Sequence, residues 1–167
     1  MRSVALYSET SLSVLVAQLR TLEVAGIPIG RTMRVDWLPG CACVLVQAAL
    51  LFRYTHWVGV YLDGRFTGWI ALVPCGNQVV EVHYGVLQSA TAREVIEAGR
   101  QMNSAISARF SAGVAYIPME SAAARVARLA GWTCIDRYER EGRQYGQWWW
   151  RNSAGTGATD CTDSAGG

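Results

Sequence analysis

Hydrophobic and polar residues follow two different periods along this chain of 167 residues. Between residues 10 and 25, apolar side chains recur every three or four positions: Leu12, Leu15, Val16, Leu19 and Leu22. That spacing predicts an amphipathic helix, which Gly26 and Pro28 should end. The segment 30–40 reads as a loop. The apolar run from Cys41 to Tyr54 fits either a buried helix or a strand, and periodicity leaves both open.

From residue 58 onward the pattern favours strands. Asp63 and Gly64 lie between two runs rich in β-branched and aromatic residues. This predicts an antiparallel hairpin of residues 58–62 and 66–73. A turn at 75–77 then leads into a third strand, 78–87, and the stretch VLQSATAREVIEAGRQMNSAI predicts a strand end running into a helix.

The remaining pattern predicts a strand at 113–117, a helix at 121–130 and two strands at 133–140 and 144–150. A strand meander followed by mixed helices and strands indicates an α+β fold, with helices packed on the faces of one sheet. We expect a single domain over residues 1–151. Residues 152–167 contain no apolar side chain larger than Ala or Cys, so we expect a flexible tail rich in Gly, Ser and Ala.

Composition excludes several classes of function. All fifteen basic residues are Arg, which removes any Lys-based mechanism, and a net charge of +2 without an Arg cluster does not favour nucleic acid as a partner. Five scattered Cys predict neither a disulfide framework nor a metal site, and they suit a reducing, cytoplasmic location. The longest apolar run, Ala42 to Phe52, is shorter than the ~20 residues that span a bilayer, so no membrane span is expected.

A segment near the C-terminus resembles a known family. Residues 120–132 read ESAAARVARLAGW, which is similar to the N-x-x-A-x-R-L-Y-x-x-x-G-F segment of the GNAT acetyltransferase superfamily. Ala123 and Arg125 take the A-x-R places, and Gly131 and Trp132 take the G-F places. The resemblance covers residues 58–150 and implies a mixed, mostly antiparallel central sheet with helices on both faces.

The same resemblance implies a binding site for acetyl-CoA where the third strand meets the following helix. The cofactor contacts would come from Val86, Gln88, Ser89, Thr91 and Arg93. Glu94 and Ile96, however, stand where the family has glycines that let the backbone approach the pyrophosphate. Thr91 and Glu94 also fit a capping box, which would satisfy the helix start internally and place a carboxylate against an anionic ligand. On these grounds no cofactor is expected, with acetyl-CoA as the alternative.

The catalytic residues that the resemblance implies are Glu81 and His83, which lie two apart on the third strand and should share a face. Either could act as the base that deprotonates an acceptor amine. A histidine in a strand is equally a core residue with a satisfied nitrogen. Ala127 stands where many members have the tyrosine that protonates the departing thiolate, so Tyr116, Tyr138 or water would have to replace that acid.

Two functions follow from these residues. The preferred one is a GNAT-fold protein with a degenerate cofactor site that serves as a structural or assembly component with protein partners. The Glu-Val-His strand and the loop after it also resemble small GNAT-like proteins of tailed phages, which implies a place in a virion. An exposed Trp149 beside Arg151 would suit such an interface. The alternative is an active acetyl-CoA-dependent N-acetyltransferase of unknown acceptor.

Overall fold

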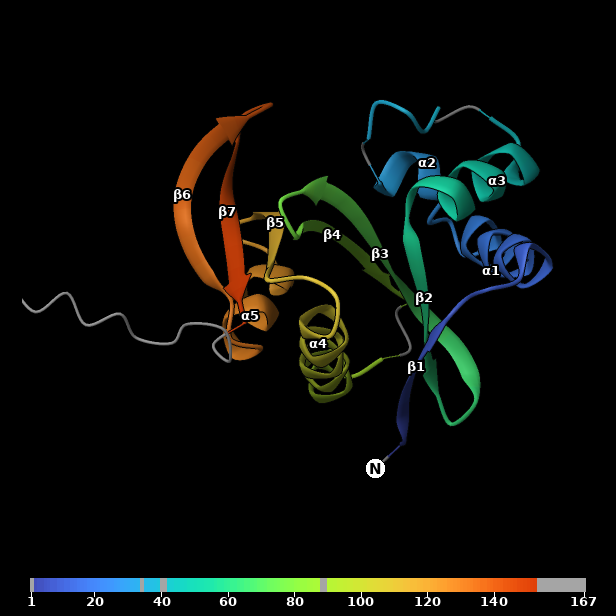
Figure 1. Cartoon of the computed structure of the whole chain (residues 1–167), viewed down its shortest axis with the longest axis horizontal. Helices are drawn as coiled ribbons and strands as arrows, with labels where there is room; N and C mark the ends of the chain where they lie inside the picture. The colour runs from blue at the N-terminus through green and yellow to red at the C-terminus, as the bar shows by residue number, and fades with distance from the viewer. Residues whose placement is uncertain (1, 34, 40–41, 88–89, 153–167) are drawn as a thin grey trace, which may run out of the picture.

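A computed structural model describes residues 2–33, 35–39, 42–87 and 90–152 of the chain (Figure 1). The elements in chain order are β1 (Val4–Ser8), α1 (Leu12–Val24), α2 (Ile29–Thr32), α3 (Val44–Tyr54), β2 (His56–Leu62), β3 (Arg65–Gly76), β4 (Val79–Val86), α4 (Ala92–Ser107), β5 (Ala112–Pro118), α5 (Ala122–Leu129), β6 (Thr133–Arg140) and β7 (Arg143–Arg151).

The strands form one sheet in the order β1-β2-β3-β4-β5-β7-β6. Each neighbouring pair is antiparallel except β4 and β5, which run parallel. The predicted α+β fold with a mixed, mostly antiparallel sheet is therefore confirmed. The structure adds β1, an N-terminal strand that the sequence pattern did not predict.

Helices cover both faces of the sheet, as expected (Figure 1). On one face, α1 and α3 bury Leu15, Leu19 and Leu51 against the stacked rings of Trp57 and Trp69. On the other face, α4 and α5 pack on a second cluster that includes Val80, Ile106, Trp132 and Trp148. Because the sheet is buried on both sides at its centre, the central strand β3 buries six consecutive residues, from 67 to 72, instead of alternating.

The turn between β2 and β3 follows its sequence signal, whereas the turn predicted at 75–77 is shifted, because β3 continues to Gly76 and Asn77 and Gln78 form the turn. Asp63 and Gly64 both adopt positive φ, +48° and +76°, and this left-handed pair joins β2 to β3 as the hairpin signal predicted. The undecided segment before β2 is the helix α3, because Gln47, Ala48 and Leu51 lie on one side of a helical turn and are buried together. Periodicity could not separate the alternatives because α3 also exposes apolar residues such as Leu45 and Phe52.

The last strand shows where its three tryptophans go. Trp148 is 1% exposed and belongs to the core beneath α5. Trp149 points to the opposite face and is half-buried, with the Arg151 guanidinium 5.8 Å from its ring centre. The predicted alternation is confirmed, but Trp149 is not the fully exposed anchor that an interface would present. The tail prediction for 152–167 falls outside the described residues except at Asn152, whose amide donates to the Ser111 carbonyl at 3.0 Å.

Candidate functional site

The parallel strands β4 and β5 separate soon after they pair. Their register covers only Val79–Glu81 against Ala112–Val114. Beyond Glu81, β4 continues to Val86 with β3 on one side, and β5 continues to Pro118 with β7 on one side. Within the described residues, the facing edges of these two stretches have no strand partner, so their backbone groups border a divergence in the middle of the sheet.

Glu81 and His83 stand at the start of this divergence. They lie on the same face of β4, as predicted, and His83 Nε2 is 2.9 Å from Glu81 Oε1. No aligned hydrogen bond from the described residues reaches that nitrogen, so the two side chains are in close contact without a directed hydrogen bond between them. Both side chains are largely but not fully covered, with 16% of His83 and 26% of Glu81 exposed. The pair is therefore neither a sealed core contact nor a surface one.

A row of tyrosines lies on the same face of the sheet. Tyr116 on β5 and Tyr138 on β6 meet edge to face at 6.3 Å between ring centres, and Tyr138 stacks on Tyr145 of β7 at 5.8 Å. Burial raises the pKa of Tyr116, and the negative charge of Glu81 raises it further. The tyrosine therefore keeps its proton at neutral pH, within electrostatic reach of Glu81.

The start of α4 is closed by its own side chains. Thr91 is the N-cap, and its hydroxyl accepts from the Glu94 amide at 3.4 Å, while Glu94 Oε2 accepts from the Thr91 amide at 2.7 Å. The predicted capping box is thus confirmed. Glu94 is only 6% exposed, so its carboxylate replaces solvent at the helix start.

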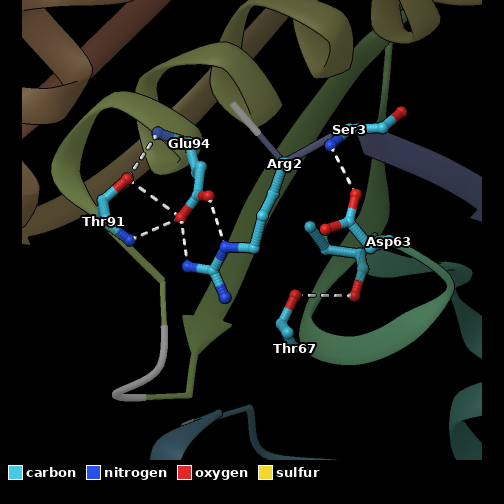
Figure 2. Close-up of polar contacts among 7 residues, drawn as sticks. Arg2, Ser3, Asp63, Thr67, Thr91 and Glu94 are labelled. Atoms are coloured by element: carbon cyan, nitrogen blue, oxygen red, sulfur yellow. Dashed lines mark hydrogen bonds and ion pairs between the residues drawn. The ribbon is translucent and has the colours of Figure 1, made fainter.

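An N-terminal arginine completes this arrangement (Figure 2). Arg2 donates from Nε and from one terminal nitrogen to the two oxygens of Glu94, each at 2.7 Å. The hydrogen bonds from Arg2 and then from the Thr91 amide lower the pKa of Glu94 to about 2. Arg2 is held in place because Ser3 and Asp63 exchange two hydrogen bonds at the β2–β3 turn, at 2.8 and 3.0 Å.

This contact changes the electrostatic argument about the helix start. From the sequence alone, the Glu94 carboxylate had no partner beyond the cap. An unpaired negative charge at that position would repel a phosphate. The structure pairs Glu94 with a guanidinium, so the local charge is balanced. Sequence reasoning missed Arg2 because 92 positions separate it from Glu94, and only the pairing of β1 with β2 brings them together.

The other cofactor candidates are only partly placed. Val86 ends β4 opposite Gly68, and the next residue, Leu87, donates its amide to Thr67. Gln88 and Ser89 lie outside the described residues. Arg93 is exposed in the first turn of α4, beside the cap. Of the described candidates, Thr91 and Arg93 lie at the helix start, and the role of all five as cofactor ligands stays a prediction.

A small apolar cavity of about 50 Å³ lies between α4, α5 and strands β2–β4. Ala127 lines it together with Glu94. Ala127 is the residue that stands in place of the acid tyrosine of the resembling family. Tyr84 also lines it, and its buried hydroxyl has no hydrogen-bond partner among the described residues. Burial raises the pKa of Tyr84 to about 12. The cavity therefore combines apolar walls with a residue whose buried donor is unsatisfied within the described residues.

The described residues contain neither a candidate metal site nor a candidate membrane-spanning helix. No group of three or more His, Cys, Asp or Glu side chains there could hold a metal ion. No helix in that part of the chain is long and apolar enough to cross a membrane.

No protein-family model and no curated protein matches this chain. Solved structures do match it. A probable acetyltransferase is 11% identical with a TM-score of 0.67, over 89% of this chain and 92% of that one. The acetyltransferase AAC(6')-Ib, in complex with paromomycin and acetyl-CoA, is 14% identical with a TM-score of 0.66, over 94% and 99%.

A GNAT-family acetyltransferase from Streptococcus pneumoniae is 9% identical with a TM-score of 0.62, over 89% of this chain and 99% of that one. The matches do not test the resemblance to tailed-phage proteins, which stays a prediction. At such low identity, structural likeness establishes the fold and nothing finer. The chain therefore has the fold of the GNAT acetyltransferases.

Proposed function

We propose that this chain is an acetyl-CoA-dependent N-acetyltransferase in which Glu81 and His83 provide the base. The observation that carries the proposal is the position of this pair, 2.9 Å apart at the point where β4 and β5 separate, with Tyr116 on the same face. A partly covered carboxylate–imidazole pair beside open strand edges suits proton transfer better than core packing.

The roles follow from the chemistry of acyl transfer. Acetyl-CoA, when bound, supplies the activated acetyl group. Glu81 or His83 takes the proton that the acceptor amine loses as its nitrogen bonds to carbon. Tyr116 is a protonated phenol at neutral pH, and burial raises its pKa further, so it would supply the proton that the departing thiolate takes up. Tyr116 would thereby replace the acid tyrosine that many family members have at the position of Ala127.

The cavity beneath α4 supports the fit of coenzyme A. The arm of this cofactor is linear, largely apolar and carries amide carbonyls, and the Tyr84 hydroxyl is a buried donor that such a carbonyl would satisfy. The cavity of about 50 Å³ takes only a few atoms, so most of the arm would lie along the open edges of β4 and β5.

A second candidate function rests on the other end of the site. Thr91, Glu94 and Arg2 satisfy one another at the start of α4, where the family binds pyrophosphate. A helix start that is already satisfied favours a protein that keeps the fold without turnover and acts through assembly with protein partners.

Calorimetric titration with acetyl-CoA separates the two functions. The acetyltransferase predicts binding in the micromolar range and release of free thiol when amines are added, which a thiol reagent detects. The Glu94→Ala variant removes the carboxylate from the helix start and should bind acetyl-CoA at least as tightly. No heat and no thermal shift in either protein at millimolar acetyl-CoA would overturn the proposal and leave the assembly function.

A further inference from the structure

We propose that two copies of this chain pair antiparallel through the outer edge of β6, around a two-fold axis at Tyr138. β6 is the last strand of the sheet, and among the described residues it pairs only with β7 (Figure 1). An edge strand offers backbone N–H and C=O groups that a further strand can use. This surface is separate from the Glu81–His83 pair, so the proposal does not depend on catalysis.

The regular part of β6 is short and centred on Tyr138. The register against β7 shifts between Cys134 and Asp136, and from there the ladder runs without interruption to Arg140. The residues that flank Tyr138 in this stretch are exposed and charged: Asp136, Arg137, Glu139 and Arg140. Charges on an edge usually prevent strand pairing. Here their order decides which partner is rejected and which is accepted.

Symmetry limits how two identical strands can pair. Directly opposed residues of an antiparallel pair point to the same face, so a two-fold axis between two copies must set one residue opposite itself. An axis at any of the four charged positions would oppose two like charges. An axis at Tyr138 is the choice within 136–140 that avoids this.

That axis makes every flanking pair complementary. Asp136 then faces the partner's Arg140, and Arg137 faces the partner's Glu139, each occurring twice by symmetry. Opposed side chains of this kind lie within about 4.5–5.5 Å between Cβ atoms, close enough for ion pairs. The sequence Asp-Arg-Tyr-Glu-Arg is therefore complementary to itself in this register. An unrelated strand would need the same charge order to fit as well, which is why a second copy is the occupant.

The aromatic row supports the same register. Tyr138 already contacts Tyr116 and Tyr145 on one face of the sheet. In the paired arrangement its next neighbour across the axis is the partner's Tyr138, so the row continues from one subunit into the other. Aromatic residues directly opposed on neighbouring strands are a favourable cross-strand pair.

Sedimentation of the full chain over a range of concentrations tests the pairing. The expected result is a dimer that weakens at high salt, because the ion pairs are exposed. Arg137→Glu would face the partner's Glu139 twice and should raise the dimer dissociation constant by about 10–100-fold. The double variant Arg137→Glu, Glu139→Arg restores opposite charges and should return the constant to near that of the unmodified chain.

A monomer at every concentration, an Arg137→Glu dimer as tight as the original, or a double variant that fails to recover would overturn the proposal. Cross-linking gives a second test that does not depend on affinity. Tyr138→Cys should form a covalent dimer on mild oxidation, because the two sulfurs meet at the axis. Asp136→Cys is the matched control, since its thiol faces the partner's Arg140. The exposed Cys43 and Cys75 set the background in the unmodified chain. Equal cross-linking in both variants would also overturn the register.

Discussion

The start of α4 and the divergence of β4 from β5 border the same part of the fold but satisfy their polar groups in opposite ways. At the start of α4, Thr91, Glu94 and Arg2 bond to one another through contacts of 2.7–3.4 Å. Along β4, the Tyr84 hydroxyl is buried without a hydrogen-bond partner in the described residues, and His83 Nε2 lies 2.9 Å from Glu81 Oε1 without an aligned hydrogen bond. The polar groups of the first region satisfy one another, whereas the second region keeps polar groups that no described residue satisfies.

The difference separates stabilising residues from candidate reactive ones. A satisfied cap stabilises the native state and has little left to offer a ligand. An unsatisfied buried donor lowers stability unless something else bonds to it, so its presence marks a candidate for ligand binding or chemistry. Substitutions at the start of α4 should therefore change mainly stability. Substitutions along β4 should change mainly ligand binding and activity.

The largest expected effect is on turnover. If Glu81 is the base, Glu81→Gln should lower the turnover number by about 10²–10⁴-fold, because an amide cannot accept the proton of the amine. His83→Ala should do the same if the imidazole is the base. Initial rates of thiol release measure both, with the exposed Glu120→Gln as the control. Unchanged turnover in both variants would remove the pair from the mechanism.

The next effect concerns acid stability. The folded pKa of Glu94 is about 2, below its ordinary value of 4.5, because of Arg2 and then the Thr91 amide. A lowered folded pKa contributes stability above pH 4.5 that is lost as pH falls through the folded value. Glu94→Gln should therefore flatten the decline in unfolding free energy between pH 4.5 and 2, as urea titrations at several pH values would measure. Parallel declines in the variant and the unmodified chain would contradict this role.

A smaller loss is expected from the cap itself. Thr91→Ala removes the hydroxyl that accepts from the Glu94 amide and should cost about 1 kcal/mol of unfolding free energy, or roughly 2–4 °C in Tm. Thr91→Ser keeps the hydroxyl and serves as the control. Thermal unfolding followed by circular dichroism measures both, and a loss as large in Ser as in Ala would show that the methyl group matters instead.

The smallest expected effect is on the unfolding free energy, and unlike the preceding losses it should be zero or a gain. Tyr84→Phe removes a buried hydroxyl that lacks a partner among the described residues and should leave the unfolding free energy unchanged or raise it by up to about 1 kcal/mol. The same variant should weaken acetyl-CoA binding if the hydroxyl contacts the cofactor arm. A clear loss of stability on denaturation would show that Tyr84 belongs with the satisfied region.

Local patterns were sufficient for much of the fold. The Asp63–Gly64 turn, the capping box of Thr91 and Glu94, and the shared face of Glu81 and His83 all depend on residues within a few positions of each other. Such features follow from backbone propensity and side-chain period, which act over short distances in the sequence. β1 was missed because it is a short strand that owes its structure to pairing with β2.

By itself, the sequence determined the α+β class, the β2–β3 hairpin, the helix cap and the shared face of Glu81 and His83 on β4. The tertiary structure alone decided that Arg2 neutralises Glu94, that β4 and β5 separate after Glu81, and that β6 lies at the edge of the sheet. The physical reason is that short-range geometry fixes each element, whereas charge pairing, strand order and exposed edges depend on contacts between residues far apart along the chain.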